Sequence, residues 1–258
     1  MIRDVTSRTN PSLKLAASLL STSGCRKAGK YIIEGPRFIG DLVGTADIDF
    51  AVLSETASDN SSSTAGLLSE AGVAVLRVPE KLFTTIASTG HSQGLAAVRS
   101  IPTFPADMVF DGRTVLILDG VGDPGNAGTA VRSAAAFDCG GVVFLRGSAY
   151  PWSPKVSRSS AGLNSVIPVI MAESLEELAS SFPDYLFLEA AADGDDIGTH
   201  EIESPVALVI GSEAAGVKEG TRRFTGGKVS IPMVPGVESL NAGVSASILL
   251  YCLFRMKL

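Results

Sequence analysis

Cysteine and histidine are scarce in this chain of 258 residues, which has three of the first and two of the second. Cys25, Cys139 and Cys252 are widely spaced and form no C-x-x-C pair, so the sequence predicts neither a disulfide framework nor a zinc site. Neither His91 nor His200 lies in a sequence context typical of a catalytic triad. We therefore expect reduced thiols, as in a cytoplasm, and no metal.

Long hydrophobic runs and an excess of positive charge are also absent. No apolar run approaches the roughly 20 residues that span a bilayer. Residues 1–4 begin no apolar stretch typical of a secretory signal. The net charge of −6 has the wrong sign for a surface that binds nucleic acid everywhere, so any RNA binding requires a local basic patch. A hydrophobic content of 45% with 19% charged residues predicts a soluble globular protein, and 258 residues fit one large or two ordinary domains. We expect a cytoplasmic protein without a membrane partner.

The first 105 residues predict a small α/β domain that begins with a basic, polar stretch. Strands are expected at residues 31–33, 50–53, 73–78 and 94–98, and helices at 12–20 and 65–71. Residues 54–64 are rich in Ser, Asp, Asn and Thr and are expected to form a mobile loop. Pro102 and Pro105 stop regular structure and mark the linker to a second domain, residues 106–258.

The second domain predicts strands that alternate with helices. The expected strands cover residues 115–118, 142–145, 166–170, 185–188, 206–210 and 228–231. The expected helices cover residues 126–137, 174–180 with Ser174 as the cap, and 240–256. This alternation favours a mostly parallel sheet that is covered by helices on both faces.

A glycine-rich loop follows the first strand of the second domain. Gly120, Gly122 and Gly125 match G-x-G-x-x-G, the pattern of a dinucleotide site. Pro124 interrupts the usual entry into the following helix, and Arg146 rather than an acidic residue follows the next strand. Because an arginine there could accept the phosphate of NADP, an NAD(P)-dependent oxidoreductase stays an alternative.

The helix after this loop carries two candidate functional side chains, Asn126 and Arg132, about one and a half turns apart. Asn126 could be a simple N-cap. Arg132 could be a solvated surface charge, but its neighbours are small and apolar, as in a closely packed helix. A guanidinium there would need a partner such as a phosphate or a carboxylate.

Two further loops follow later strands and point to the same edge of the sheet. In the loop of residues 211–216, Gly211 and Gly216 permit close approach of a ligand, and Glu213 is either a helix-start charge or a group that positions a partner. The loop of residues 231–241 is rich in Pro and Gly and ends in Ser239-Leu240-Asn241, where a helix begins. Free backbone N–H groups at this helix start can hold a small polar ligand, which predicts a binding site at the carboxyl ends of the strands.

In this order, the three loops resemble the three motifs of the SpoU (TrmH-like) RNA 2′-O-ribose methyltransferases of the SPOUT superfamily. The matching segments are residues 123–128 with Arg132 and 136–137, residues 211–216, and residues 231–233 with 239–241. The first domain is similar to the RNA-binding extension of this family at residues 10–11 with Lys14, 34–35 and 93–95. The chain departs from the family pattern at residues 138–139, which precede Gly140, and at residues 234–236.

The resemblance implies a C-terminal domain with a deep trefoil knot that binds S-adenosylmethionine and works as a homodimer. The matching cofactor positions are Gly211, Ile231, Met233 and Leu240. Arg132 would be the central catalytic residue, with Asn126 and Ser239 orienting the reacting groups and Asn241 and Glu213 bracing the loops. Expected RNA-binding residues are Arg8, Asn10, Lys14, Arg26, Lys155 and Arg158. Ribosomal RNA is favoured over tRNA as the substrate, and a non-catalytic RNA-binding protein with the same fold is the second alternative.

Overall fold

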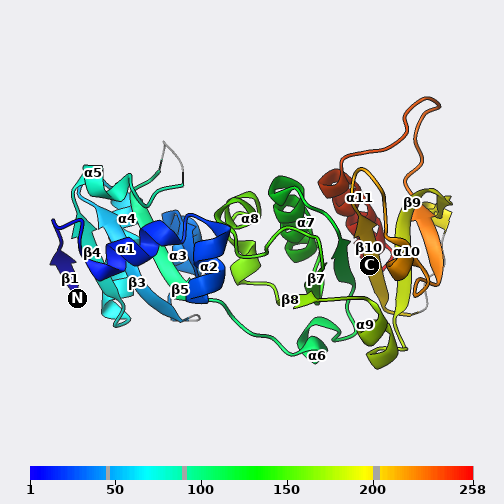
Figure 1. The fold of residues 1–258 in the computed structure, drawn as a ribbon, viewed down its shortest axis with the longest axis horizontal. Coiled ribbons are helices and arrows are strands. Elements are labelled where there is room, and N and C mark those ends of the chain that lie inside the picture. The colour runs from blue at the N-terminus through cyan, green and yellow to red at the C-terminus, as the bar shows by residue number, and fades with distance from the viewer. Residues whose placement is uncertain (45–46, 89–91, 200–203, 258) are drawn as a thin grey trace. The chain divides into compact units, whose positions relative to one another are not determined.

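The computed structural model describes residues 1–44, 47–88, 92–199 and 204–257, which form two compact units. The first unit comprises Met1–Pro102 and Trp152–Arg158, and the second comprises Thr103–Pro151 and Ser159–Leu258. Each unit has a sheet of its own (Figure 1). His91 and His200 lie outside the described residues. Among the residues described, no helix combines the length and the apolar character needed to cross a bilayer.

The first unit is built on a mixed sheet with the order β1-β4-β3-β5-β2, in which β5 is antiparallel to both of its neighbours. The strands are β1 (Ile2–Asp4), β2 (Lys30–Glu34), β3 (Ile48–Ser54), β4 (Ala74–Val78) and β5 (Leu95–Ser100). The helices are α1 (Pro11–Ser18), α2 (Thr22–Ala28), α3 (Pro36–Asp41), α4 (Asp59–Glu70) and α5 (Glu80–Phe83). The small α/β domain expected from the sequence is therefore present.

Helix α4 begins inside the segment that was expected to be a mobile loop, so that prediction is wrong from Asp59 onward. Ser58 caps the helix, because its hydroxyl accepts a hydrogen bond from the backbone N–H of Ser61. The fully buried Ser61 hydroxyl donates to the carbonyl of Gln93 at 2.7 Å. Small hydroxyl side chains that find such partners can be buried, which lets a polar run form a packed helix.

The second unit is built on a six-stranded sheet with the order β11-β9-β10-β6-β7-β8, in which every neighbouring pair is parallel. The strands are β6 (Val115–Asp119), β7 (Gly141–Leu145), β8 (Val169–Ala172), β9 (Leu186–Asp196), β10 (Val206–Gly211) and β11 (Gly227–Ser230). The α-helices are α6 (Ala106–Val109), α7 (Pro124–Ala136), α9 (Glu176–Ser181), α10 (Glu219–Arg222) and α11 (Ala242–Arg255), and the 3₁₀ helices are η1 (Leu163–Ser165) and η2 (Ile197–Thr199). Helix α8 (Pro154–Ser159) belongs to the first unit except for its last residue. The expected parallel sheet is confirmed.

Both faces of this sheet are buried, which explains why its strands read as continuous apolar runs. On one face, Ile117 and Val209 belong to a core that also includes Phe110 and Leu178 of the α6 and α9 regions. Helices α7 and α11 lie side by side (Figure 1), and the hydroxyls of Ser133 and Ser247 join them at 2.6 Å. This pairing places the start of α11 beside the start of α7.

Several element boundaries differ from the sequence-based expectation. The N-cap of α9 is Leu175 rather than Ser174, and no side chain caps this helix. Leu175 is buried in the core, so packing rather than capping sets the start of the helix. Strand β8 begins at Val169, after η1, and β9 continues to Asp196, well beyond the expected end at residue 188. The extension of β9 provides one wall of the site.

Candidate active site

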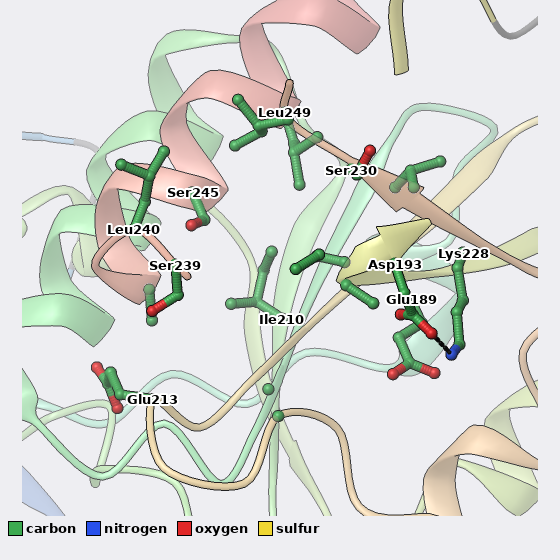
Figure 2. A pocket seen from close by; sticks show the side chains of 18 of the residues that line it. Glu189, Asp193, Ile210, Glu213, Lys228, Ser230, Ser239, Leu240, Ser245 and Leu249 are labelled. Atoms are coloured by element: carbon green, nitrogen blue, oxygen red, sulfur yellow. Dashed lines mark hydrogen bonds and ion pairs between the residues drawn. The ribbon is translucent and has the colours of Figure 1, made fainter. Parts of the chain in front are cut away.

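A cavity of about 450 Å³ opens along β9 and at the ends of β10 and β11 (Figure 2). Its walls come from β9, from the loops that follow β10 and β11, and from the first half of α11. The four expected cofactor residues, Gly211, Ile231, Met233 and Leu240, all line it, and Ser239 and Glu213 do so as well. Its volume lies in the range of about 300–1,000 Å³ that is usual for small-molecule sites.

Glycine is required at position 211 because the loop after β10 folds back onto the strand end. A Cβ atom there would lie 2.0 Å from the carbonyl carbon of Gly216 and 2.2 Å from the nitrogen of Val217. The turn is closed by two backbone hydrogen bonds between Ser212 and Gly216, of 3.0 and 2.8 Å. Gly216 has a φ of 64°, a value that favours glycine. The cavity wall at this loop is therefore backbone, which a ligand can approach closely.

A chain of side-chain amides joins the three loops. The Asn126 Nδ2 atom donates to Glu213 Oε1, and the Asn241 Nδ2 atom donates to Asn126 Oδ1 at 2.8 Å. Asn241 Oδ1 in turn accepts the N–H groups of Gly243 and Val244, so Asn241 caps α11 as expected. Asn126 is not an N-cap, because Asp123 caps α7 and leaves the Asn126 side chain to make this connection. Residues more than 100 positions apart are thus held at one place.

Arg132 projects from α7 into solvent. Its neighbours Ala130, Val131 and Ala134 are buried, whereas Arg132 itself is exposed. In the described part of the chain its guanidinium has no hydrogen-bond or ion-pair partner, and Arg132 is not among the residues that line the cavity. The group is therefore available to an anion that comes from outside this chain.

Two ion pairs in the cavity wall were missed by the sequence reasoning. Arg222 forms a two-pronged contact with Glu189, with N–O distances of 3.0 and 3.1 Å, and Lys228 pairs with Asp193 at 2.7 Å. Glu189 is 2% exposed. The hydrogen bonds that Arg222 donates to Glu189 raise the pKa of Arg222, and the hydrogen bond from Lys228 lowers the pKa of Asp193. The sequence did contain a sign of Glu189, which directly follows the apolar residues at the start of β9. The neighbouring strand, β10, leads into the loop of the site.

The glycine-rich loop after β6 is occupied by the protein's own charged groups. Lys218 donates through Nζ and through its backbone N–H to the two oxygens of the buried Asp119, both at 2.8 Å. Its ammonium group also packs against Gly120. At the start of α7, the Asp123 carboxylate accepts the N–H of Asn126, where a dinucleotide would place its pyrophosphate. This arrangement disfavours NAD(P) binding at the G-x-G-x-x-G pattern.

The expected RNA-binding residues lie on α1, α2, α8 and the segment before α1. Arg8, Lys14, Arg26, Lys155 and Arg158 are exposed. Asn10 uses its side-chain oxygen to cap α1 by accepting the N–H groups of Ser12 and Leu13. Arg158 donates to the carbonyl of Ser88 at 3.2 Å. Within the described ranges, no group of three or more His, Cys, Asp and Glu residues could hold a metal ion.

The parallel sheet, with its tight loop after β10 and its cavity against α11, matches the fold of the SPOUT methyltransferases. The structure of an AdoMet-bound rRNA methyltransferase from Sinorhizobium meliloti is similar, with a TM-score of 0.87 and 26% identity over 100% of this chain and 99% of that chain. The AdoMet complex of the SpoU methyltransferase AviRb from Streptomyces viridochromogenes shares the fold, with a TM-score of 0.85 and 23% identity over 96% of this chain and 99% of that chain.

Residues 113–251 match the SpoU rRNA Methylase family, and residues 10–97 match the MRM3-like substrate binding domain. The chain belongs to the SpoU rRNA methylase family. It is 29% identical to the 23S rRNA (guanosine(2553)-2′-O)-methyltransferase RlmP of Bacillus subtilis, over 97% of this chain and 98% of that protein. It is 28% identical to an uncharacterized tRNA/rRNA methyltransferase of Synechocystis sp., over 97% of this chain and 93% of that protein.

Proposed function

We propose that this protein transfers a methyl group from S-adenosylmethionine to a ribose 2′-hydroxyl of RNA, with ribosomal RNA favoured over tRNA. The observation that carries the proposal is the cavity, whose backbone-lined wall at Gly211 lies beside the linked side chains of Asn126, Glu213 and Asn241. The similarity to the B. subtilis 23S rRNA 2′-O-methyltransferase and to the AdoMet-bound S. meliloti enzyme supports this assignment.

The cavity fits S-adenosylmethionine in size and in chemistry. Ile210, Leu240 and Leu249 provide apolar surface for a flat base, and the loops of residues 211–216 and 231–241 would hold polar edges through their backbone. The cofactor supplies a methyl group on a positively charged sulfur, which is already activated for transfer. The chain therefore has to position the acceptor oxygen in line with this methyl group and to provide for its proton.

Arg132 binds the phosphate beside the target ribose in this proposal. A guanidinium is effectively always protonated, so Arg132 cannot be the base, and the hydroxyl proton passes to that phosphate or to water. Asn126 and Ser239 orient the ribose or Arg132. Asn241 and Glu213 hold the loops in place through their hydrogen bonds with Asn126. A planar fork suits a phosphate better than a point charge does, which explains why arginine is used.

We assign residues 1–105 to RNA binding and residues 106–258 to cofactor binding and catalysis. Arg8, Asn10, Lys14, Arg26, Lys155 and Arg158 would contact the RNA, and the match of residues 10–97 to a substrate binding domain supports this role. Val244 and Tyr251, which are 43% and 48% exposed on α11, offer apolar surface to a second copy in a homodimer. We also propose that the C-terminal domain contains a trefoil knot and that the protein is located in the cytoplasm.

The test is to map 2′-O-methylation in total RNA from cells with and without this protein. We expect one or a few riboses, most of them in 23S ribosomal RNA, to lose the modification when the protein is absent and to regain it with the wild type but not with Arg132→Ala. Unmodified RNA incubated with the purified protein and S-adenosylmethionine should gain the same marks. Methyl groups on bases, or no change at any ribose, would contradict the proposal.

A further inference from the structure

Charge is distributed unevenly around the cavity. Among the described residues, three carboxylates line it, from Glu189, Asp193 and Glu213, and two cations line it, from Arg222 and Lys228. The cations pair with Glu189 and Asp193 at the end formed by β9 and β11. Glu213 lies at the opposite end, close to Ser239 (Figure 2). These described side chains therefore carry one net negative charge, which lies at the Glu213 end of the cavity.

Of the carboxylates that line the cavity, Glu213 is the one with which no cation of the described residues forms an ion pair. Its Oε1 atom accepts a hydrogen bond from the neutral amide of Asn126. Among the residues described, no Lys or Arg nitrogen lies within the 4.0 Å ion-pair distance of its carboxylate. A neutral donor satisfies the hydrogen-bonding capacity of an oxygen without cancelling the charge, so Glu213 presents a negative potential to anything bound beside it.

We propose that Glu213 makes this cavity prefer the cationic methyl donor over its neutral product. This inference rests on the proposed function. S-adenosylmethionine and S-adenosylhomocysteine differ by a methyl group and by the positive charge on sulfur, while their amino, carboxylate and adenosine groups are the same. An uncompensated carboxylate near the sulfur therefore distinguishes the two by charge, whereas apolar and backbone contacts treat them nearly alike.

The position of the amide chain places the sulfur at the Glu213 end. The methyl group has to face the RNA, and the side chains assigned to the acceptor, Asn126 and Ser239, lie at that end. The ion pairs of Glu189 with Arg222 and of Asp193 with Lys228 lie at the other end, where the charges cancel and do not attract the sulfonium. Loss of the charge on sulfur during methyl transfer then removes the attraction to Glu213, which favours release of the product.

The expected effect on binding is moderate, because Glu213 is exposed. For two unit charges about 6 Å apart at an effective dielectric constant of about 40, Coulomb's law corresponds to about a tenfold change in the dissociation constant. Only ligands with a charge at the sulfur position should show this change.

The experiment is a calorimetric titration of the full chain with three probes. They are S-adenosylmethionine, S-adenosylhomocysteine and sinefungin, which carries an ammonium group where the donor carries its sulfonium. The variant is Glu213→Gln, which keeps an oxygen that can accept from Asn126 while removing the charge. The matched control is Glu177→Gln on the exposed surface of α9, which removes the same net charge away from the cavity.

We expect Glu213→Gln to weaken the two cationic probes about tenfold and to leave S-adenosylhomocysteine nearly unchanged, with no such change in the control. An equal loss for all three probes, or no loss, would overturn the inference and leave the cofactor assignment standing. If the wild type binds none of them, the proposed function itself fails. If Glu213→Gln does not fold, the wild type alone tests the inference. Raising the salt concentration should reduce the difference in affinity between the cationic probes and the neutral one, and an unchanged difference would overturn the inference.

Discussion

Adding one methyl group at Gly211 should damage the cofactor site more than the stability of the protein. The Cβ atom of Gly211→Ala would lie 2.0 Å from the Gly216 carbonyl carbon, whereas real Cβ contacts are almost never under 3.0 Å. The loop of residues 212–217 therefore has to move by about 1 Å. Such overpacking costs about 1–3 kcal/mol, which corresponds to a loss of roughly 2–12 °C in Tm for a chain of this size.

The same displacement moves Glu213 and one wall of the cavity, and a misplacement of about 1 Å can cost about a hundredfold in rate. Calorimetric binding of S-adenosylmethionine and methyl transfer to RNA measure the loss, and thermal unfolding measures the stability. Gly220→Ala is the matched control, because a Cβ atom there meets nothing within 4 Å. If Gly211→Ala binds the cofactor as the wild type does and keeps its Tm, the close backbone approach at this loop is wrong.

Three further perturbations test other parts of the structure. Arg132→Ala should abolish methyl transfer while cofactor binding stays intact. Arg132→Lys should restore little activity, because lysine lacks the planar fork of the guanidinium. If Arg132→Ala still methylates RNA in a single-turnover assay, Arg132 has no part in the mechanism. Asp119→Asn should lower the free energy of unfolding, measured in urea, by about 1–2 kcal/mol. This loss is smaller than for a fully buried ion pair, because Lys218 is half exposed. An unchanged urea midpoint would show that the pair does not anchor the loop. Burial raises the pKa of Cys139 from 9.0 to about 12, so between these values the unfolded chain releases a proton that the native chain keeps, and the free energy of unfolding falls as the pH rises. Cys139→Ala should flatten this slope in urea titrations across the alkaline range, and an identical slope would contradict the burial of the thiol.

Local patterns were sufficient to predict most strands of the second domain and the loops that form the site. A strand buried on both faces is apolar throughout, so runs such as residues 206–210 indicate a parallel sheet without further information. Glycine at 211 and asparagine at 241 report local backbone needs, a close approach and a helix cap, which is why these positions were found from the sequence.

Contacts between distant segments could not be predicted in the same way. The pair of Glu189 with Arg222 joins residues 33 positions apart, and the pair of Asp119 with Lys218 joins residues 99 positions apart. Each residue alone reads as an ordinary charge near a strand or helix end. The first half of α4, residues 59–64, was missed for a related reason, because the partner of the buried Ser61 hydroxyl is a carbonyl 32 residues away.

We propose that the cavity between β9, the loop after β10 and α11 holds the methyl donor with its methyl group facing the side of Asn126 and Arg132. A crystal structure of the protein with S-adenosylmethionine bound is the decisive test of this placement. We expect the adenosine against Leu240 and Leu249, the sulfur near Glu213, and Arg132 within reach of a nucleotide whose ribose faces the methyl group. A donor bound elsewhere, or an Arg132 that no nucleotide could reach in the assembled protein, would refute this placement of the donor and the role of Arg132.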